Sequence, residues 1–276
     1  MRIEFCKMHG CGNDFMVFES PAGARLPDAD QLRRLAQRHT GIGFDQALLL
    51  QPPRRPNTAV YYRIFNADGL EVEQCGNGAR CIASLLFRRG RITAGPVTLD
   101  SPGGLVQARV EDAATVAVAI GVPDFDPRAL PFEAAQQAQT YELQVGDSTV
   151  PIAVVSIGNP HAVLIVRSSE EAPVQTLGPA IENHPRFPRR VNVGFMQVVD
   201  RSHIRLRVYE RGAGETLACG TGACAAVAVG RSRGLLEAEV KVSVRGGELR
   251  VNWGAAREPV WLTGPAEVSF EGQVEV

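Results

Sequence analysis

The 276-residue sequence has no apolar run that approaches the ~18 residues of a membrane-spanning helix. Its longest apolar stretches, around residues 82–87 and 225–229, are short and are flanked by arginine. It also lacks an apolar segment of signal-peptide length behind a basic start. These absences argue against a membrane partner or an exported protein, and we expect a cytoplasmic location.

An excess of charge of one sign is absent, because 29 Lys and Arg face 30 Asp and Glu, a net charge of −1. A balanced chain gives no basic footprint for nucleic acid, so we expect no nucleic-acid partner. Six cysteines in 276 residues are too few for a disulfide scaffold. The C-x-x-C spacing of zinc and thioredoxin-like sites is missing, and so is a phosphate-binding G-x-x-x-x-G-K-[ST] loop. We therefore expect no metal.

An internal repeat is present. Residues 75–90 read CGNGARCIASLLFRRG and residues 219–234 read CGTGACAAVAVGRSRG, and both 219 − 75 and 234 − 90 equal 144. Glycine pairs at 103–104 and 246–247 follow in alternating patterns that are typical of hairpins. The Gly-Asn pairs at 12–13 and 158–159 precede the two copies at an offset of 146. Several matches in one order indicate a duplication.

Each half reads as strands, a Cys-Gly turn, one apolar helix and a hairpin, which predicts a mixed α/β (α+β) fold of two pseudo-symmetric domains. We expect the first domain over residues 1–121, with 265–276 returning to it, and the second over 122–264. The periodicity predicts a surface helix over Gln31–Arg38, N-capped by Asp28 or Asp30. Apolar helices are predicted over 83–89 and 223–231. Strands are predicted over 59–65, 95–100, 115–121, 152–156, 162–166, 203–209, 239–244, 260–263 and 268–276.

Cys75 and Cys219 each precede a Gly-x-Gly segment that opens a helix. A helix N-terminus offers backbone N–H groups to a carboxylate, and its field lowers the pKa of a thiol there. Two such thiols suit removal of a proton from one face of a stereocentre and its replacement on the other, without a cofactor. The other cysteines (Cys6, Cys11, Cys81 and Cys224) are interpreted as buried apolar residues.

The chain resembles the diaminopimelate epimerase family over essentially its whole length. The motifs that carry the resemblance are MHGCGNDF (8–15), GFDQ (43–46), FNADGLEVEQCGNGARC (65–81), GNPH (158–161), VNVGF (191–195) and ERGAGETLACGTGAC (210–224). The resemblance implies two domains, each a β-barrel-like sheet around a central helix, with the active site in the interdomain cleft. It implies a cofactor-independent isomerase that interconverts LL- and meso-diaminopimelate in lysine biosynthesis and peptidoglycan precursor supply.

The same resemblance assigns roles to individual residues. Cys75 and Cys219 become the acid/base thiols, and the reacting carboxylate is held by the turns Gly76-Asn77 and Gly220-Thr221. The distal clamp of the substrate comprises Asn66, Asn159, Asn192 and Arg211. Further polar contacts come from Asn13, Gln46 and Glu210, and the thiol pKa values are modulated by His161 and Glu210. The family implies a homodimer, with Phe270 as a contact.

One position departs from the family pattern, because Cys11 stands where we expect an apolar residue. Proline or hydroxyproline racemases remain an alternative, although their substrates lack the distal amino acid group that a clamp with Arg211 would bind. An isomerase of the phenazine-biosynthesis type lacks the cysteine pair. A binding protein without catalysis would hold the ligand without exchanging its α-hydrogen.

Overall fold

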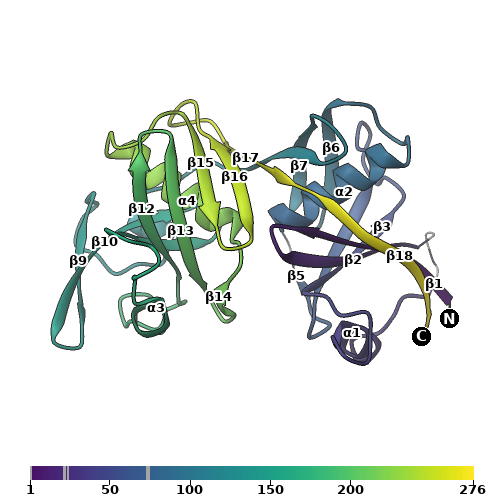
Figure 1. Cartoon of the computed structure of the whole chain (residues 1–276), viewed down its shortest axis with the longest axis horizontal. Coiled ribbons are helices and arrows are strands. Elements are labelled where there is room, and N and C mark those ends of the chain that lie inside the picture. The colour runs from purple at the N-terminus through teal and green to yellow at the C-terminus, as the bar shows by residue number, and fades with distance from the viewer. Residues whose placement is uncertain (1, 21–22, 24, 73–74) are drawn as a thin grey trace. The chain divides into compact units, whose positions relative to one another are not determined.

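The computed structural model describes residues 2–20, 23, 25–72 and 75–276. The chain divides into two compact units, Met1–Val118 with Thr263–Val276, and Ala119–Leu262. Among the described residues, no helix has both the length and the apolar character needed to cross a membrane. Each unit is described below by itself (Figure 1).

The first unit is built on one curved sheet. Its core is a run of neighbouring strands in which β2 lies parallel to β3 and β4 parallel to β6, while the other pairs are antiparallel. The last strand of the chain, β18 (Glu267–Glu275), pairs with the first, β1 (Arg2–Gly10), and the two lie side by side in Figure 1. The remaining strands are β2 (Asn13–Glu19), β3 (Gln46–Gln51), β4 (Tyr61–Asn66), β5 (Glu71–Val72), β6 (Gly95–Ser101), β7 (Gly104–Val110) and β8 (Thr115–Gly121).

Two helices of this unit have different environments. Helix α2 (Gly76–Arg88) is buried from Asn77 through Leu86 and contacts β1, β2, β6 and β7, so strands surround it. Helix α1 (Ala29–Ala36) lies on the surface, and buries Leu32 and Leu35. It is N-capped by Asp28, whose side chain accepts from the backbone of Gln31. The predicted surface helix is thus confirmed, but it begins and ends two residues earlier than the apolar period indicated.

The second unit repeats this plan. Strand β11 lies parallel to β12 and β13 parallel to β15, while the other pairs are antiparallel. Helix α4 (Gly220–Ser232) is buried from Gly222 through Gly230 and contacts β10, β11, β12, β13 and β16. The other elements are β9 (Tyr141–Val145), β10 (Ser148–Ser156), β11 (Pro160–Ile165), β12 (Asn192–Asp200), β13 (His203–Glu210), β14 (Gly214–Thr216), β15 (Glu239–Val244), β16 (Gly247–Asn252), β17 (Val260–Pro265), α3 (Val174–Glu182) and the 3-10 turn Pro127–Ala129.

The duplication is visible in matched glycines. Both central helices end before a glycine of positive φ, Gly90 at 66° and Gly234 at 69°. Both following hairpins turn on glycines of positive φ, Gly104 at 112° and Gly247 at 144°. Two repeated halves, each a barrel-like sheet around one central helix, therefore confirm the predicted fold class.

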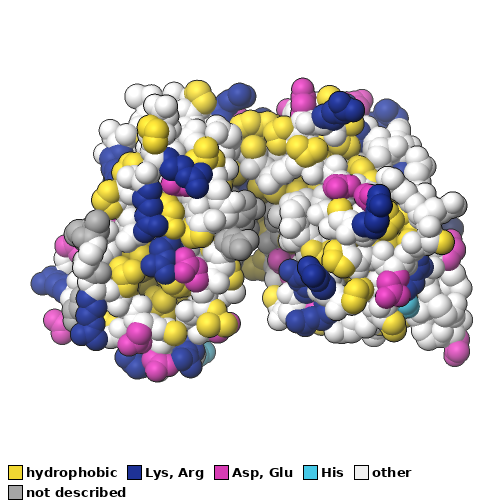
Figure 2. Space-filling model, turned by 180° about the vertical axis from the view of Figure 1, so that it is seen from behind, with side chains coloured by type: hydrophobic (Ala, Val, Ile, Leu, Met, Phe, Trp, Pro, Cys, Tyr) yellow, Lys and Arg dark blue, Asp and Glu magenta, His cyan; other side chains and the backbone are white. Residues whose placement is uncertain are grey.

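Charges of both signs share the surface. On the face drawn in Figure 2, lysine and arginine side chains are interspersed with aspartate and glutamate. Oppositely charged side chains pair in the structure, as in Arg63–Glu71 at 2.7 Å and Arg89–Glu19 at 2.7 Å. Such exposed pairs contribute little to stability, typically below about 1 kcal/mol each.

Candidate active site

Both predicted thiols occupy the same place in the fold, because Cys75 is the N-cap of α2 and Cys219 is the N-cap of α4. The sulfur of Cys75 accepts from the backbone N–H of Gly78 at 3.4 Å. The sequence prediction that each Cys-Gly turn opens a helix is therefore confirmed. Glu73 and Gln74, which precede Cys75 in the sequence motif, lie outside the described residues.

The second glycine of each Gly-x-Gly segment is required by close packing. A Cβ at Gly78 would lie 3.1 Å from Leu48 Cδ2 of β3. A Cβ at Gly222 would lie 3.0 Å from Val208 Cγ2 of β13 and 3.2 Å from the sulfur of Cys219. Glycine thus lets the first turn of each central helix approach a strand closely, and this contact fixes where the cysteine sits.

Three predicted polar residues of the first unit lie where neighbouring strands of its sheet begin or end. Asn13 and Gln46 begin the parallel strands β2 and β3, and Asn66 ends β4 opposite Gln46. Gln46 Nε2 donates to Asn66 Oδ1 at 2.9 Å. The turn before Asn13 uses positive φ at Cys11 (54°) and Gly12 (84°), which closes the β1–β2 hairpin tightly.

Asn13 links this edge to α2. Its Oδ1 accepts from Asn77 Nδ2 at 3.1 Å and lies 3.9 Å from the sulfur of Cys75. Gln46 Oε1 and Asn77 Oδ1 are buried and have no hydrogen-bond partner among the described residues. Buried acceptors of this kind are suited to a ligand that brings N–H or ammonium donors.

The second unit places Cys219 in a different polar environment. Its sulfur lies 3.6 Å from Thr221 Oγ1, and Asn159 Nδ2 donates to the same hydroxyl at 3.2 Å. His161 Nε2 lies 3.0 Å from Asn159 Oδ1. Cys219 is 4% exposed and His161 is 1% exposed, whereas Asn159 and Thr221 are partly exposed.

Asn192 and Arg211 also meet in this unit. Asn192 Nδ2 donates to the carbonyl of Pro160 at 2.9 Å, and its Oδ1 accepts from the backbone N–H of Arg211 at 3.0 Å. The guanidinium of Arg211 donates to the carbonyl of Arg189 at 3.2 Å, which leaves most of its N–H groups available to an anion. The side chain of Glu182 holds the loop after Arg211, because it accepts from the backbone N–H of Gly212 at 2.7 Å.

The electrostatics of Cys219 correct one expectation. Burial raises the pKa of the Cys219 thiol well above its usual value, and the nearby Glu210 carboxylate raises it further. Hydrogen bonds from Thr221 and the backbone of Gly222 act in the opposite direction but are weaker. The sequence predicted a lowered pKa from the helix field, and this is wrong because desolvation dominates. Burial also lowers the pKa of His161 to about 3, so its imidazole is neutral near pH 7.

The site residues of the two units correspond through the repeat. Asn159 matches Asn13 and Asn192 matches Gln46, both at an offset of 146 (159 − 13 and 192 − 46). The offset is 144 for 210 − 66 and 219 − 75, so Glu210 replaces Asn66 and Cys219 repeats Cys75. Each unit thus supplies one thiol and a set of polar side chains from equivalent strand ends.

Sequence reasoning missed an ionic cluster beside Asn13. Asn13 Nδ2 donates to Asp45 Oδ2 at 3.0 Å, and Arg38 donates to both Asp45 (2.7 Å) and Asp14 (2.8 Å). The only sequence signal was the position of Asp14 and Asp45 inside the motifs MHGCGNDF and GFDQ. The other four cysteines are buried, as predicted. No group of three or more His, Cys, Asp or Glu suited to a metal occurs in the described part of the chain.

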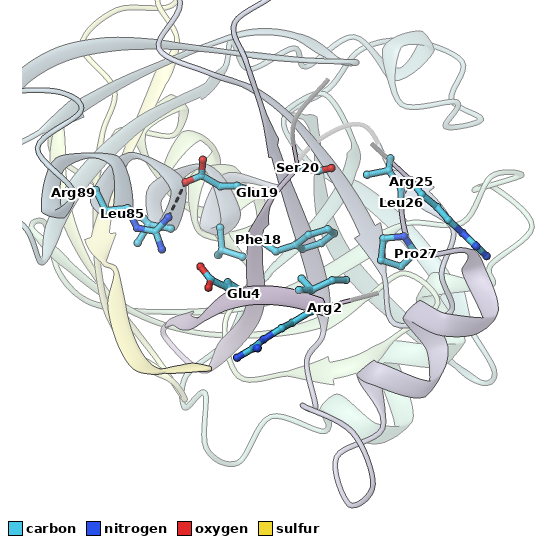
Figure 3. Close-up of a pocket in the computed structure, with 12 residues that line it drawn as sticks. Arg2, Glu4, Phe18, Glu19, Ser20, Arg25, Leu26, Pro27, Leu85 and Arg89 are labelled. Carbon is cyan, nitrogen blue, oxygen red and sulfur yellow. Dashed lines mark hydrogen bonds and ion pairs between the residues drawn. The ribbon is translucent and has the colours of Figure 1, made fainter. Parts of the chain in front are cut away.

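A cavity of about 530 Å³ lies elsewhere on the first unit, lined by residues of β1, β2 and the C-terminal end of α2 (Figure 3). Its described lining includes Glu19, which is paired with Arg89, and none of the residues predicted for the active site. Ser20 and Arg25, which follow β2 in the sequence, also line it. It is therefore separate from the predicted site residues.

Comparison with known proteins identifies the family of the chain. The family model for diaminopimelate epimerase matches residues 5–125 and 153–269. The diaminopimelate epimerase of Nitrosomonas eutropha is 52% identical over 279 residues, and that of Alkalilimnicola ehrlichii is 51% identical over 278 residues. Both alignments cover 100% of this chain and 100% of the relative.

Solved structures share the fold at much lower identity. A hydroxyproline epimerase from Agrobacterium vitis is 18% identical with a TM-score of 0.68, covering 99% of this chain and 92% of that one. A phenazine biosynthesis family protein from Enterococcus faecalis is 14% identical with a TM-score of 0.69, covering 100% of both chains. These two show the fold alone, whereas the full-length identity above 50% shows the family. The chain belongs to the diaminopimelate epimerase family and is an isomerase.

Proposed function

We propose that this chain converts LL-2,6-diaminopimelate to meso-diaminopimelate by a two-base mechanism that uses Cys75 and Cys219 and no cofactor. The observation that carries the proposal is the repeated placement of one thiol at the N-cap of each central helix. One sulfur, as thiolate, removes the α-proton, and the other, as thiol, delivers a proton to the opposite face. In the reverse direction the two sulfurs exchange roles.

The reacting carboxylate is assigned to the first turns of α2 and α4. Backbone N–H groups at Gly76-Asn77 and Gly220-Thr221 have no intrahelical partners, and they point along the positive end of each helix dipole. They stabilise negative charge as it develops on the carboxylate during proton removal. Preorganised donors of this kind replace the electron sink that a cofactor would otherwise supply.

The unreactive end of the substrate is assigned to a second set of residues. Arg211 supplies a guanidinium for the distal carboxylate, a pairing that is favoured by its planar donors. Amide side chains provide the remaining distal contacts: Asn66, Asn159 and Asn192. Contacts to the reacting amino acid centre come from Asn13, Gln46 and Glu210, and the Glu210 carboxylate receives the ammonium. The buried acceptors Gln46 Oε1 and Asn77 Oδ1 support this assignment.

His161 and Glu210 are assigned to the control of the thiol pKa values. Glu210 acts directly, because its carboxylate raises the pKa of Cys219. His161 acts through Asn159, which donates to the hydroxyl of Thr221 beside the sulfur. Because the imidazole of His161 is neutral, it adds no charge to the buried surroundings of Cys219, which already disfavour the thiolate.

The biological setting follows from the family. We propose that the protein acts in the cytoplasm, in lysine biosynthesis and in the supply of peptidoglycan precursors. We also propose a homodimer with Phe270 at the contact, because this large apolar side chain on β18 is 49% exposed. Its ring packs edge-on against Phe5 at 5.9 Å, so it is held in place before any partner binds.

Proton NMR tests the proposed reaction. LL-diaminopimelate is incubated with reduced protein in deuterated water without added cofactor. Loss of one α-hydrogen signal together with formation of the meso isomer supports the proposal. Exchange with proline or hydroxyproline instead would assign the chain to those racemases, and binding without any exchange would indicate a non-catalytic binding protein.

A further inference from the structure

The amide of Asn13 is held in one orientation by Asp45. Asn13 Nδ2 donates to Asp45 Oδ2 at 3.0 Å, and the backbone N–H of Asp14 donates to the same oxygen at 3.1 Å. An ionised carboxylate can only accept, so the NH₂ group of Asn13 must face Asp45. The carbonyl oxygen of the amide is therefore directed to the opposite side.

That opposite side faces the N-cap of α2. Asn13 Oδ1 accepts from Asn77 Nδ2 at 3.1 Å, and lies within sulfur hydrogen-bond distance of Cys75 Sγ at 3.9 Å. An acceptor oxygen can bind the S–H form of the cysteine but repels its thiolate. The orientation of one amide thus favours the protonated form of Cys75.

Asp45 is itself held by ionic contacts. Arg38 donates to Asp45 Oδ1 at 2.7 Å and forms two bonds to the Asp14 carboxylate, at 2.8 and 2.9 Å. The backbone N–H of Asp45 donates back to Asp14 Oδ1 at 2.9 Å, and Lys7 also binds Asp14. Burial would raise the pKa of Asp14, but the hydrogen bonds from Arg38 and Lys7 outweigh it and lower the value to about 2. Asp14 is therefore ionised at neutral pH.

The second unit has no equivalent of this arrangement. The residue that corresponds to Asp45 in the repeat is Val191 (191 − 45 = 146), whose side chain has no hydrogen-bond acceptor. Asn159, the equivalent of Asn13, instead donates to Thr221 and contacts His161. The two thiols consequently meet different hydrogen-bonding groups, although their helices are placed alike.

We propose that Asp45 is a positioning residue, which fixes the Asn13 amide with its oxygen toward Cys75 and so sets the protonation preference of that thiol. The inference rests on the proposed function, in which Cys75 is an acid/base group. Tyr62 of β4 and Cys81 of α2 are titratable groups that interact electrostatically with Cys75. Burial raises the pKa of both, that of Cys81 to about 12, so neither is charged near pH 7.

Asp45→Asn is the informative substitution. The carboxamide has one oxygen in place of two, so it cannot accept from Arg38 on one side and from Asn13 and the backbone N–H of Asp14 on the other. The charge of Arg38 attracts the oxygen more strongly than the two neutral donors do, which turns the NH₂ group toward Asn13. The two NH₂ groups, of residue 45 and of Asn13, would then face each other. Asn13 relieves this contact by reversing its amide, so that its NH₂ group faces the sulfur of Cys75. We expect the pKa of Cys75 to fall by about 0.5–1 unit, the effect of one hydrogen bond.

The measurement is the pH dependence of alkylation of Cys75 by iodoacetamide, read by mass spectrometry of the peptide that contains it. Removing the Asp45 charge also lowers the pKa through space, so the substitution is made in the native chain and in an Asn13→Ala background. The account predicts that the shift largely disappears in the Asn13→Ala background. An equal shift in both backgrounds, or no shift in the native chain, would overturn it.

Two further variants keep the test decisive. Glu19→Gln removes a carboxylate of the same unit that pairs with Arg89 and Arg91, and is expected to leave the alkylation profile unchanged. Should Asp45→Asn fail to fold, Asp45→Ser removes the same carboxylate from a shorter side chain and is read in the same way. Absence of epimerisation by the native chain would overturn the proposed function, whereas the alkylation shifts test Asp45 independently of turnover.

Discussion

The hydroxyl of Thr221 lies 3.6 Å from the sulfur of Cys219 and also accepts from Asn159 at 3.2 Å. The hydroxyl can donate its proton to a Cys219 thiolate while it accepts from Asn159, because it has one donor and two acceptor lone pairs. Thr221 thus opposes burial and Glu210, both of which raise the pKa of Cys219. This hydroxyl is the side-chain group that most directly favours the Cys219 thiolate.

Thr221→Val tests that role. Valine keeps the shape of the side chain but removes the donor, so the pKa of Cys219 is expected to rise by about 0.5–1 unit. The limb of the kcat/KM profile on which the rate rises with pH should move to higher pH by the same amount, with a lower rate at pH 7. Thr221→Ser retains the hydroxyl and serves as the control. A valine variant with the native pH profile would remove Thr221 from the control of this thiol.

Arg211→Met tests the distal clamp. The loss of a charge-assisted pair with the distal carboxylate is expected to raise KM for diaminopimelate by at least tenfold, since such bonds contribute about 1.5–3 kcal/mol. Arg205→Met, at an exposed arginine of β13, the strand that precedes Arg211, is the matched control and should leave KM unchanged. Native kinetics in the Arg211 variant would contradict the assignment.

His161 predicts a pH dependence of stability. Burial lowers its pKa in the folded state to about 3, whereas an unfolded histidine has a pKa of about 6.5. Below pH 6.5 the unfolded chain binds a proton that the folded chain does not, so stability is lost as the pH falls from 6.5 toward 3. At pH 4.5 this amounts to about 2 kcal/mol of the free energy of unfolding.

Urea unfolding followed by tryptophan fluorescence measures that loss. Both tryptophans, Trp253 and Trp261, belong to the unit that contains His161, so the signal reports that unit. His161→Gln keeps an amide near Asn159 but does not titrate, and its stability should fall less between pH 6.5 and 4.5. Equal losses in both proteins would show that His161 is not held neutral by burial.

The sequence predicted the repeat and the helix openings because both depend on local patterns. Cys75 and Cys219 are followed by glycines that a close strand requires, and this signature is readable at fixed spacing. The apolar positions of Leu32 and Leu35 predicted the surface helix. Only its ends differ from the prediction, because the capping box at Asp28 sets where the helix starts.

The rest depended on contacts between residues far apart in the sequence. Arg38 reaches Asp14 across 24 positions, and Asn13 reaches Asp45 across 32, through the parallel pairing of β2 and β3. The raised pKa of Cys219 follows mainly from burial. The position of a thiol at a helix N-terminus, which is all that the sequence indicated, gives no measure of its burial. Motif spacing therefore located the thiols, whereas their electrostatic environment required the packed structure.

The two-base mechanism is tested most directly by isotope incorporation in the first turnovers. In deuterated water, one sulfur retains the abstracted proton while the other delivers deuterium, so new meso-diaminopimelate should contain deuterium at the inverted carbon before the remaining LL substrate does. Cys75→Ala and Cys219→Ala should each abolish epimerisation while retaining the fold. Product that keeps the original hydrogen, or either variant with substantial activity, would contradict the assignment of Cys75 and Cys219 as the two bases.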